Sequence, residues 1–199
     1  MLKYRVARFY YTLIFSVIII LTLLFSSLWV EGNKNIFLKK NARAAQENTL
    51  YRVTQVHDGD TVSIRISSFK KIPAKTERVR LIGIDAPEIK QEPWGRRSKK
   101  QLKDFIGKSD WIVSIELDLE QRDKYGRILG YLWDKKGRCI NMLMVETGYA
   151  MAYTLPPNVK YADQLTEAQS KAREEKKGLW RDNAFKKTPR QWRTENPRI

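Results

Sequence analysis

One short segment of the sequence, residues 79–88 with the letters VRLIGIDAPE, combines the pattern of a buried strand with an abrupt stop. Its apolar residues favour a β-strand that packs into a core. Pro87 cannot donate a backbone hydrogen bond to a neighbouring strand, so the strand is expected to stop near Asp85. Two carboxylates, Asp85 and Glu88, then lie at a strand end, with Arg80 earlier on the same strand. This grouping favours a metal and phosphate site, although a turn with ordinary surface charges would use the same letters.

The N-terminal part of the chain carries an uncharged run from Tyr10 to Val30 after a short basic start. At about 1.5 Å per residue, a helix of this length can cross the hydrocarbon core of a bilayer. We therefore expect an N-terminal hydrophobic helix within residues 1–30 that serves as an uncleaved membrane anchor. A cleaved signal peptide and a buried helix of a soluble protein are the alternatives. Basic residues flank the run on both sides and leave its orientation open; we prefer the N-terminus inside.

The rest of the chain divides into a basic tether at residues 31–48, a folded domain at 49–180 and a basic polar tail at 181–199, with Trp192 as the candidate anchor of the tail. The chain has 38 Lys+Arg against 22 Asp+Glu, and this net charge of +16 favours a polyanionic partner. The single cysteine excludes an intramolecular disulfide, and the single histidine argues against chemistry that needs two histidines. Phosphate chemistry here would have to use carboxylates, arginines and a hard metal ion.

Alternation of apolar and polar residues predicts five short strands, at about residues 51–56, 62–66, 78–85, 111–117 and 128–133. Apolar residues at helical spacing predict three helices, at about residues 94–108, 142–147 and 161–177. Asn141 is the expected cap of the second helix, and Gly178 the expected end of the third. Five short strands with inserted and appended helices favour an α+β fold that is mainly β, namely a five-stranded OB-type barrel with three helices.

Three separated segments place acids and arginines at the starts or ends of the predicted strands. They are Asp58-Gly59-Asp60-Thr61, then Arg80 with Asp85-Ala86-Pro87-Glu88, and last Asp123-Lys124-Tyr125-Gly126-Arg127. Each motif alone is weak, but the ordered set is specific. It resembles the staphylococcal nuclease (thermonuclease) family over roughly residues 50–180, including the helical segments NMLMVETGYAMAY and the one ending KKGLW.

The resemblance implies the family's five-stranded OB barrel with three helices and the activity of a calcium-dependent, sugar-nonspecific endonuclease that cleaves DNA and RNA. It implies that Asp60 and Asp85 are the Ca²⁺ ligands and that the backbone carbonyl of Ala86 completes the protein part of the metal site. Asp58 resembles the nearby acid that holds water around the metal. Ala86 stands where the best-known member has threonine, and a main-chain oxygen is little affected by that change.

The same resemblance assigns the catalytic groups. Glu88 matches the proposed general base, and Arg80 and Arg127 match the two phosphate-binding arginines. A further set resembles residues that line the nucleotide pocket: Lys124, Tyr125 and Tyr153. The loop before Asp123 is one residue shorter than in the best-known member, and so is the stretch after Tyr149, which weakens the pocket assignments most.

The residue types support this chemistry on their own. Calcium prefers hard oxygen ligands and tolerates irregular geometry, two guanidinium groups can hold phosphate oxygens, and a carboxylate can activate water. Weak calcium sites work only where calcium is plentiful, so we expect the nuclease domain outside the cytoplasm. It would be anchored in the membrane, or secreted if the N-terminal segment is cleaved, and we expect the soluble domain to be monomeric.

Two other readings predict no catalysis. One is a nuclease-like module that has lost catalysis and only binds nucleic acid or another polyanion. Inactive copies in this family typically lose the acids or arginines, and this sequence keeps all of them. The other is a membrane-anchored basic protein that binds a polyanionic envelope polymer, without calcium dependence and without cleavage.

Overall fold

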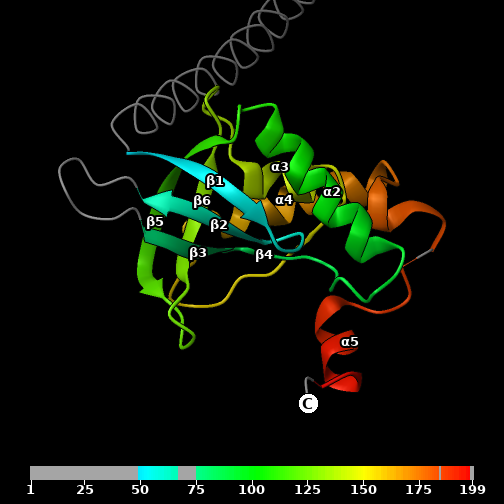
Figure 1. The fold of residues 1–199 in the computed structure, drawn as a ribbon. Helices are drawn as coiled ribbons and strands as arrows, with labels where there is room; N and C mark the ends of the chain where they lie inside the picture. The colour runs from blue at the N-terminus through cyan, green and yellow to red at the C-terminus, as the bar shows by residue number, and fades with distance from the viewer. Residues whose placement is uncertain (1–48, 67–74, 184, 198–199) are drawn as a thin grey trace, which may run out of the picture. The chain divides into compact units, whose positions relative to one another are not determined.

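The computed structural model describes residues 49–66, 75–183 and 185–197, and five of its strands form a closed β-barrel (Figure 1). The barrel strands follow one another in the order β1-β2-β3-β6-β5, and β1 pairs with β5 to close it. Their bounds are Leu50–Val56 for β1, Thr61–Ile66 for β2, Lys75–Leu81 for β3, Ile112–Arg122 for β5 and Ile128–Trp133 for β6. The pair β3 and β6 is parallel, and the other pairs are antiparallel. The predicted five-stranded, OB-type α+β barrel is confirmed.

The alternation of apolar residues explains why these segments form a barrel wall. Val62 and Ile64 of β2 are fully buried, and so are Val79 and Leu81 of β3. Because successive strand residues point to opposite faces, these side chains fill the barrel interior. Arg80 lies between Val79 and Leu81 in β3, so its side chain points to the outer face of the wall.

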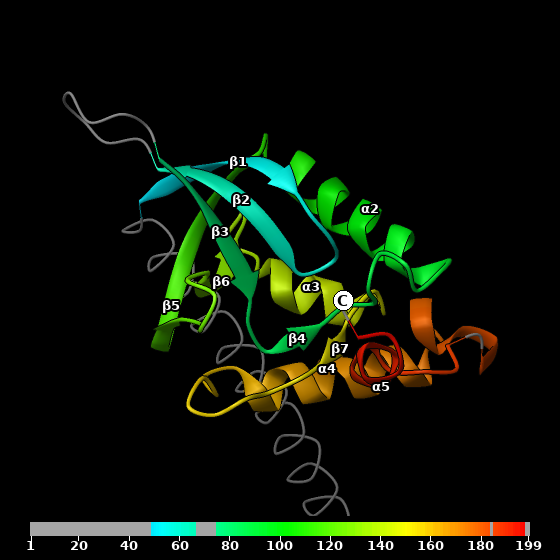
Figure 2. The same ribbon diagram turned by 60° about the horizontal axis from the view of Figure 1, so that its bottom comes forward.

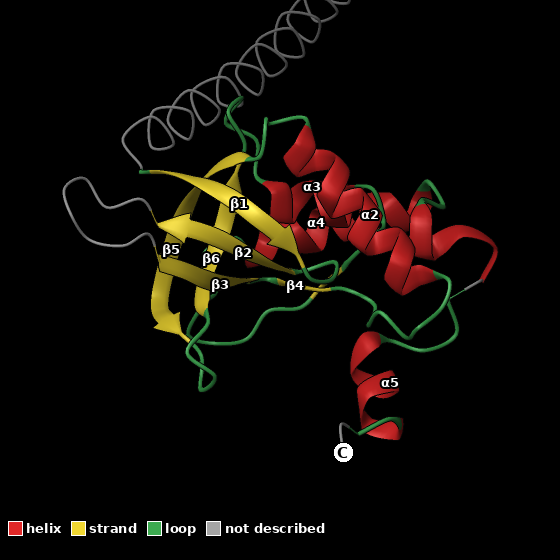
Figure 3. Ribbon diagram, viewed as in Figure 1, coloured by secondary structure: helices red, strands yellow, loops and turns green. Residues whose placement is uncertain are grey.

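Helices gather beside one side of the barrel (Figure 3). Their bounds are Trp94–Gly107 for α2, Ile140–Glu146 for α3, Ala162–Glu174 for α4, Gly178–Asn183 for the 3-10 helix η1 and Pro189–Glu195 for α5. The helix α3 contacts both α2 and α4, and it also packs against β6. The three helices predicted for the barrel domain are present as α2, α3 and α4, and α5 is a further α-helix that the prediction for the tail did not include.

The predicted strand at residues 78–85 is interrupted. The strand β3 ends at Leu81, and a separate short strand, β4 (Ile84–Asp85), pairs with β7 (Met151–Ala152). Gly83 separates the two with φ +75°, a backbone conformation that favours glycine. A Cβ on Gly83 would also lie 2.5 Å from the Leu165 Cδ1 atom of α4. The break takes Asp85 out of the barrel sheet, and its backbone pairs with Met151 of β7.

Asn141 is not the cap of α3. Cys139 takes that position without a side-chain cap, and Asn141 lies inside the helix, fully buried. Its Oδ1 atom accepts a hydrogen bond from the Leu132 amide at 3.0 Å, and its Nδ2 atom donates to the Ile82 carbonyl at 2.8 Å. This buried amide therefore ties β6 to the connection between β3 and β4. The preference of asparagine for helix N-caps led to the wrong prediction. A buried polar side chain must form hydrogen bonds with whatever partners the fold places near it, and those of Asn141 lie outside α3.

The third predicted helix, observed as α4, ends earlier than predicted. The helix α4 stops at Glu174, before the expected end near Lys177, and Gly178 begins η1 rather than closing α4.

Within the described part of the chain, none of the helices combines the length and the apolar character needed to cross a bilayer. The hydrophobic helix predicted at residues 1–30 and the tether at 31–48 lie outside the described residues, so both stay predictions.

Candidate active site

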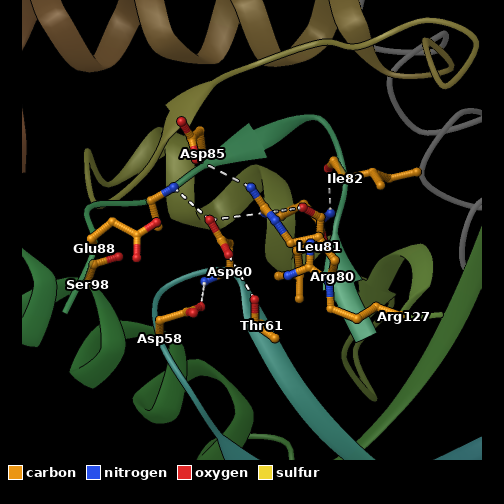
Figure 4. A network of polar contacts seen from close by, with 12 residues as sticks. Asp58, Asp60, Thr61, Arg80, Leu81, Ile82, Asp85, Glu88, Ser98 and Arg127 are labelled. Carbon is orange, nitrogen blue, oxygen red and sulfur yellow. Dashed lines mark hydrogen bonds and ion pairs between the residues drawn. The ribbon is translucent and has the colours of Figure 1, made fainter. Parts of the chain in front are cut away.

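The turn between β1 and β2 brings Asp58 and Asp60 to one rim of the barrel (Figure 4). The Oδ1 atom of Asp58 accepts a hydrogen bond from the Asp60 amide at 3.0 Å, which shapes the turn. Gly59 lies buried between them, and a Cβ there would lie 1.9 Å from the Ser98 Oγ atom and 2.6 Å from the Ala86 Cβ atom. The turn therefore packs directly against α2 and against the loop after β4, and glycine makes this approach possible.

Asp60 connects three parts of the site through its buried carboxylate. Its Oδ2 atom accepts a hydrogen bond from the Ala86 amide at 2.9 Å and lies 3.0 Å from the Arg80 Nη1 atom. Its Oδ1 atom accepts a hydrogen bond from the Thr61 hydroxyl at 3.0 Å. The start of β2 is thereby joined to β3 and to the segment that follows β4.

Arg80 lies between the two aspartates that the sequence singled out as metal ligands. Its Nη2 atom is 3.4 Å from the Asp85 Oδ1 atom, and its Nη1 atom donates to the Leu81 carbonyl at 2.7 Å. The side chain of Asp85 is only 4% exposed. One guanidinium group on the outer face of β3 thus orients the carboxylates of Asp60 and Asp85 toward one another.

The loop after β4 carries Glu88, and Figure 4 shows it among the labelled residues of this site. The start of α2 holds this loop in place, because the backbone of Gly95 packs on the backbone of Glu88. A Cβ on Gly95 would lie 2.0 Å from the Glu88 carbonyl oxygen. The structure therefore brings together Asp58, Asp60, Arg80, Asp85, Ala86 and Glu88, which the sequence predicted as one site.

The electrostatics of this rim are dominated by negative charge. Burial raises the pKa of Asp60 to about 7, the neighbouring carboxylates of Asp58 and Asp85 add to the rise, and Arg80 opposes it. Arg80 pairs with two of these three carboxylates, Asp60 and Asp85, so the negative charge around it exceeds its own and favours a further cation.

The donor set suits calcium. Asp60 and Asp85 offer hard carboxylate oxygens, and the Ala86 carbonyl lies on the same short loop. Among the described residues there is no group of three or more histidine, cysteine, aspartate or glutamate side chains arranged to hold a metal by itself. Two carboxylates and one carbonyl would leave coordination positions for water and for a phosphate oxygen.

Arg127 lies in the turn that leads into β6, and a single carboxylate organises that turn. The Asp123 Oδ1 atom accepts hydrogen bonds from the amides of Tyr125 at 2.9 Å and Arg127 at 3.0 Å, and its Oδ2 atom accepts from the Arg127 Nε atom at 2.7 Å. In the parallel pairing, Arg80 lies opposite Leu129. Arg127 precedes Leu129 by two residues, so it faces the same side as Arg80 (Figure 4).

The same turn occurs a second time, at the other end of β6. The letters DKYGR at residues 123–127 and DKKGR at 134–138 form equivalent hydrogen bonds. The Asp134 carboxylate accepts from the amides of Lys136 and Arg138 at 2.9 Å each, and from the Arg138 Nε atom at 2.7 Å. The motif therefore determines the local conformation of Arg127. It does not determine the position of Arg127 at the site, because the second copy of the motif lies at the other end of β6.

The residues expected at a nucleotide pocket occupy two places. Lys124 and Tyr125 belong to the turn before Arg127, where the Tyr125 side chain is exposed and the Arg127 guanidinium lies 5.6 Å from its ring centroid. The amide of Tyr153 donates to the Gly83 carbonyl at 2.9 Å, which places Tyr153 next to the break between β3 and β4.

Sequence reasoning missed one residue of this site. Arg193 of α5 contacts the carboxylates of Asp85 and Glu88, whereas the tail was expected to be anchored by Trp192. One more basic residue in a basic tail carries no distinctive signal. Neither its spacing nor its neighbours in the sequence indicate that it reaches a carboxylate more than one hundred residues earlier.

The barrel, its appended helices and a cluster of carboxylates and arginine at one rim together define a small barrel protein of the kind that acts on phosphodiesters. The sequence of residues 78–182 matches the family described as "Staphylococcal nuclease homologue". An endonuclease of Escherichia coli described as uncharacterized is 38% identical over 132 residues, which cover 66% of this chain and 76% of the relative. The chain belongs to the staphylococcal nuclease family.

Two further relatives cover more of the chain. The thermonuclease of Staphylococcus hyicus is 28% identical over 169 residues, which cover 82% of this chain and 94% of the relative. An uncharacterized endonuclease of Haemophilus influenzae is 34% identical over 160 residues, which cover 80% of this chain and 81% of the relative. The resemblance inferred from the three motifs is thereby confirmed at the level of the family.

The packing of Gly59 generates a first prediction. In Gly59→Ala, the added Cβ meets Ser98 and Ala86 and displaces the turn that carries Asp58 and Asp60. We expect kcat/KM for nucleic-acid hydrolysis to fall by about 10²-fold, since a displacement of about 1 Å at a catalytic site has an effect of that size.

Gly107→Ala is the matched control, because a Cβ on Gly107 at the end of α2 would have no neighbouring atom within 4 Å. Its kcat/KM should equal that of the wild type. Equal activity in Gly59→Ala and Gly107→Ala would mean that the turn does not need its close approach to α2.

Proposed function

We propose that the protein is a calcium-dependent, sugar-nonspecific endonuclease that hydrolyses phosphodiester bonds of DNA and RNA outside the cytoplasm. The observation that carries the proposal is the pair of buried carboxylates, Asp60 and Asp85, held at one rim of the barrel by Arg80. Membership of the staphylococcal nuclease family and relatives named thermonuclease and endonuclease support it.

In this proposal Asp60, Asp85 and the Ala86 carbonyl would hold the calcium ion, and Asp58 would hold water beside it. A bound calcium ion supplies positive charge that polarises the phosphodiester and offsets its growing negative charge. Since the Ala86 amide already donates to Asp60, the loop after β4 is fixed with its backbone at the site. The metal ligands would therefore be held in place before the ion arrives, which limits the cost of ordering them.

The side chains that would act on the substrate lie around these ligands. Arg80 and Arg127 face the same side of the β3 and β6 pair and would donate hydrogen bonds to non-bridging phosphate oxygens. Glu88 would accept a proton from the attacking water, a contribution of roughly 10²- to 10⁴-fold in rate. Lys124, Tyr125 and Tyr153 would contact the nucleotide. The basic surface of the chain would attract the polyanionic substrate in a salt-dependent way.

The location follows from the metal and from the N-terminal segment. Weak calcium sites, with dissociation constants on the order of 10⁻⁴–10⁻³ M, function in extracellular surroundings. An N-terminal anchor within residues 1–30, with its N-terminus inside, would place the barrel there, and cleavage of the segment would secrete it. The location can be tested by fusing to the C-terminus a reporter that functions only in the cytoplasm. Activity of this reporter would contradict the proposed location.

Calcium dependence is tested by incubating the full-length protein with single-stranded DNA in millimolar calcium and, separately, with a calcium chelator. We expect cleavage only with calcium, and none in Asp60→Asn, which removes the ligand charge but keeps a carbonyl oxygen that can accept from the Ala86 amide. Asp104→Asn is the control, because Asp104 pairs with Lys100 on the exposed side of α2. Binding of DNA without cleavage would favour an inactive nuclease-like module instead.

The repeated turn provides a test for Arg127. We expect Arg127→Ala to lower kcat by about 10²-fold or more, as loss of one preorganised hydrogen-bond donor does in other enzymes. Arg138→Ala removes the same contacts to an aspartate from the equivalent turn at the other end of β6. It should match Arg127→Ala in thermal stability and the wild type in kcat. Equal kcat values for the two variants would mean that Arg127 does not act in the reaction.

A further inference from the structure

Arg193 of α5 makes the most extensive contact of the tail with the candidate site. Its Nη2 atom lies 2.8 Å from the Asp85 Oδ2 atom and its Nη1 atom 3.0 Å from the Asp85 Oδ1 atom. The Nη1 atom also donates to the Glu88 Oε1 atom at 3.1 Å. The guanidinium group therefore grips both oxygens of Asp85 in the forked geometry that arginine uses for carboxylates, and it adds a third bond to Glu88.

These contacts use the groups that the proposed reaction needs. Asp85 is a proposed calcium ligand, and its Oδ1 atom is already 3.4 Å from Arg80, so Arg193 leaves it surrounded by guanidinium groups. A positive charge at this distance from both Asp85 oxygens repels a divalent cation. The bond from Arg193 also occupies the Glu88 Oε1 atom, one of the two oxygens that would accept a proton from the attacking water. A docked Arg193 and a bound calcium ion are thus alternatives.

The segment that carries Arg193 is held in a defined conformation. The Thr188 Oγ1 atom accepts a hydrogen bond from the Gln191 amide at 3.2 Å, and the Gln191 Oε1 atom accepts from the Thr188 amide at 2.9 Å, which forms a capping box at the start of α5. The buried Gln91, in the loop after β4, donates from its Nε2 atom to the Lys187 carbonyl at 2.7 Å. Arg193 therefore approaches the site from a short helix whose base is docked beside Glu88.

The helix α5 nevertheless buries few of its residues against the rest of the protein. Within α5, Pro189 is buried, and the other residues are exposed or half-buried. A helix of seven residues is not stable by itself in water, so α5 depends on its capping box, on the Lys187–Glu195 ion pair, on the Gln91 bond to Lys187 and on the contacts of Arg193. Figure 2 looks almost along the axis of α5, and Figure 1 shows α5 as a separate element apart from the barrel strands and from α4. An ion that competes for Asp85 can therefore release the segment.

We propose that residues 185–197 form a strap that closes the active site by placing Arg193 on Asp85 and Glu88, and that calcium and the docked strap exclude one another. The strap rests on the proposed function, because its release is driven by the ion that the same carboxylates would bind. In the absence of calcium, Arg193 supplies the cation that the anionic rim requires. When calcium is plentiful, it displaces Arg193, and the rim opens to the phosphodiester.

The first test measures calcium affinity without substrate, by titration calorimetry on the full-length protein. Arg193→Gln removes the competing charge, and we expect its calcium dissociation constant to fall by at least about fivefold, the lower end of typical coupling between two sites. Arg190→Gln is the matched control, because it removes the same charge from an exposed position of the same helix. Its dissociation constant should stay at the wild-type value. A dissociation constant for Arg193→Gln that is unchanged or higher overturns the strap.

The second test follows the strap itself by amide hydrogen exchange at residues 190–195. Calcium should speed exchange of this segment in the wild type, and in Arg193→Gln exchange should be fast with or without calcium. Slow exchange in Arg193→Gln without calcium would show that Arg193 does not hold the segment and would overturn the proposal. If neither the wild type nor the variants bind calcium, the proposed metal-dependent function fails, while exchange without calcium still decides whether Arg193 docks the segment.

Cleavage rates separate the strap from a role in substrate binding. At limiting calcium, Arg193→Gln should cleave single-stranded DNA faster than the wild type, and Arg190→Gln should cleave at the wild-type rate. A slower rate for Arg193→Gln at saturating calcium would instead make Arg193 a phosphate-binding residue and would overturn the strap.

Discussion

The buried carboxylate of Asp60 is the interaction on which the arrangement of the site depends. It accepts a hydrogen bond from the Ala86 amide and pairs with Arg80, and thereby joins the start of β2, the end of β3 and the loop after β4. Burying a charge is costly unless the charge is paired and hydrogen-bonded, and here both conditions are met. Because Gly59 packs next to it against Ser98 and Ala86, the turn cannot move without moving this carboxylate. The rim of the barrel is therefore rigid where the chemistry requires precise positions.

The same network leaves an excess of negative charge. Asp58, Asp60 and Asp85 share the rim with Arg80; burial raises the pKa of Asp60, and the charges of Asp58 and Asp85 add to the rise. A cation is the general solution, and the protein offers two of them in our proposals: a calcium ion from outside and the guanidinium group of Arg193 from its own tail. Catalysis and its restraint would then follow from one physical property of the rim, because the charge that attracts the metal also attracts the strap.

Local sequence patterns predicted most of the barrel, and they failed where a tertiary contact decided the outcome. Alternating apolar residues located all five barrel strands, since the period of a strand is visible in the sequence. They missed the break at Gly83, which depends on its positive φ and on the approach of Leu165 from a distant helix. The sequence pattern predicts a helix cap at Asn141, yet its side-chain amide bonds to two backbone groups outside its own helix. The membrane segment lies outside the described residues and stays a prediction.

The sequence by itself determined the chemistry of the turns, the alternation of the strands and, through three ordered motifs, the family. The local hydrogen bonds of DKYGR and DKKGR are the same, and the choice of Arg127 came from the resemblance of the ordered motifs to the family. Only the tertiary structure gives the physical reason for that choice, since the parallel register of β6 against β3 brings Arg127 to the side of Arg80. It also brought Arg193 onto Asp85 across 108 positions of sequence. Short-range hydrogen bonds are encoded in neighbouring residues, whereas the meeting of distant charges is set by how the whole chain packs.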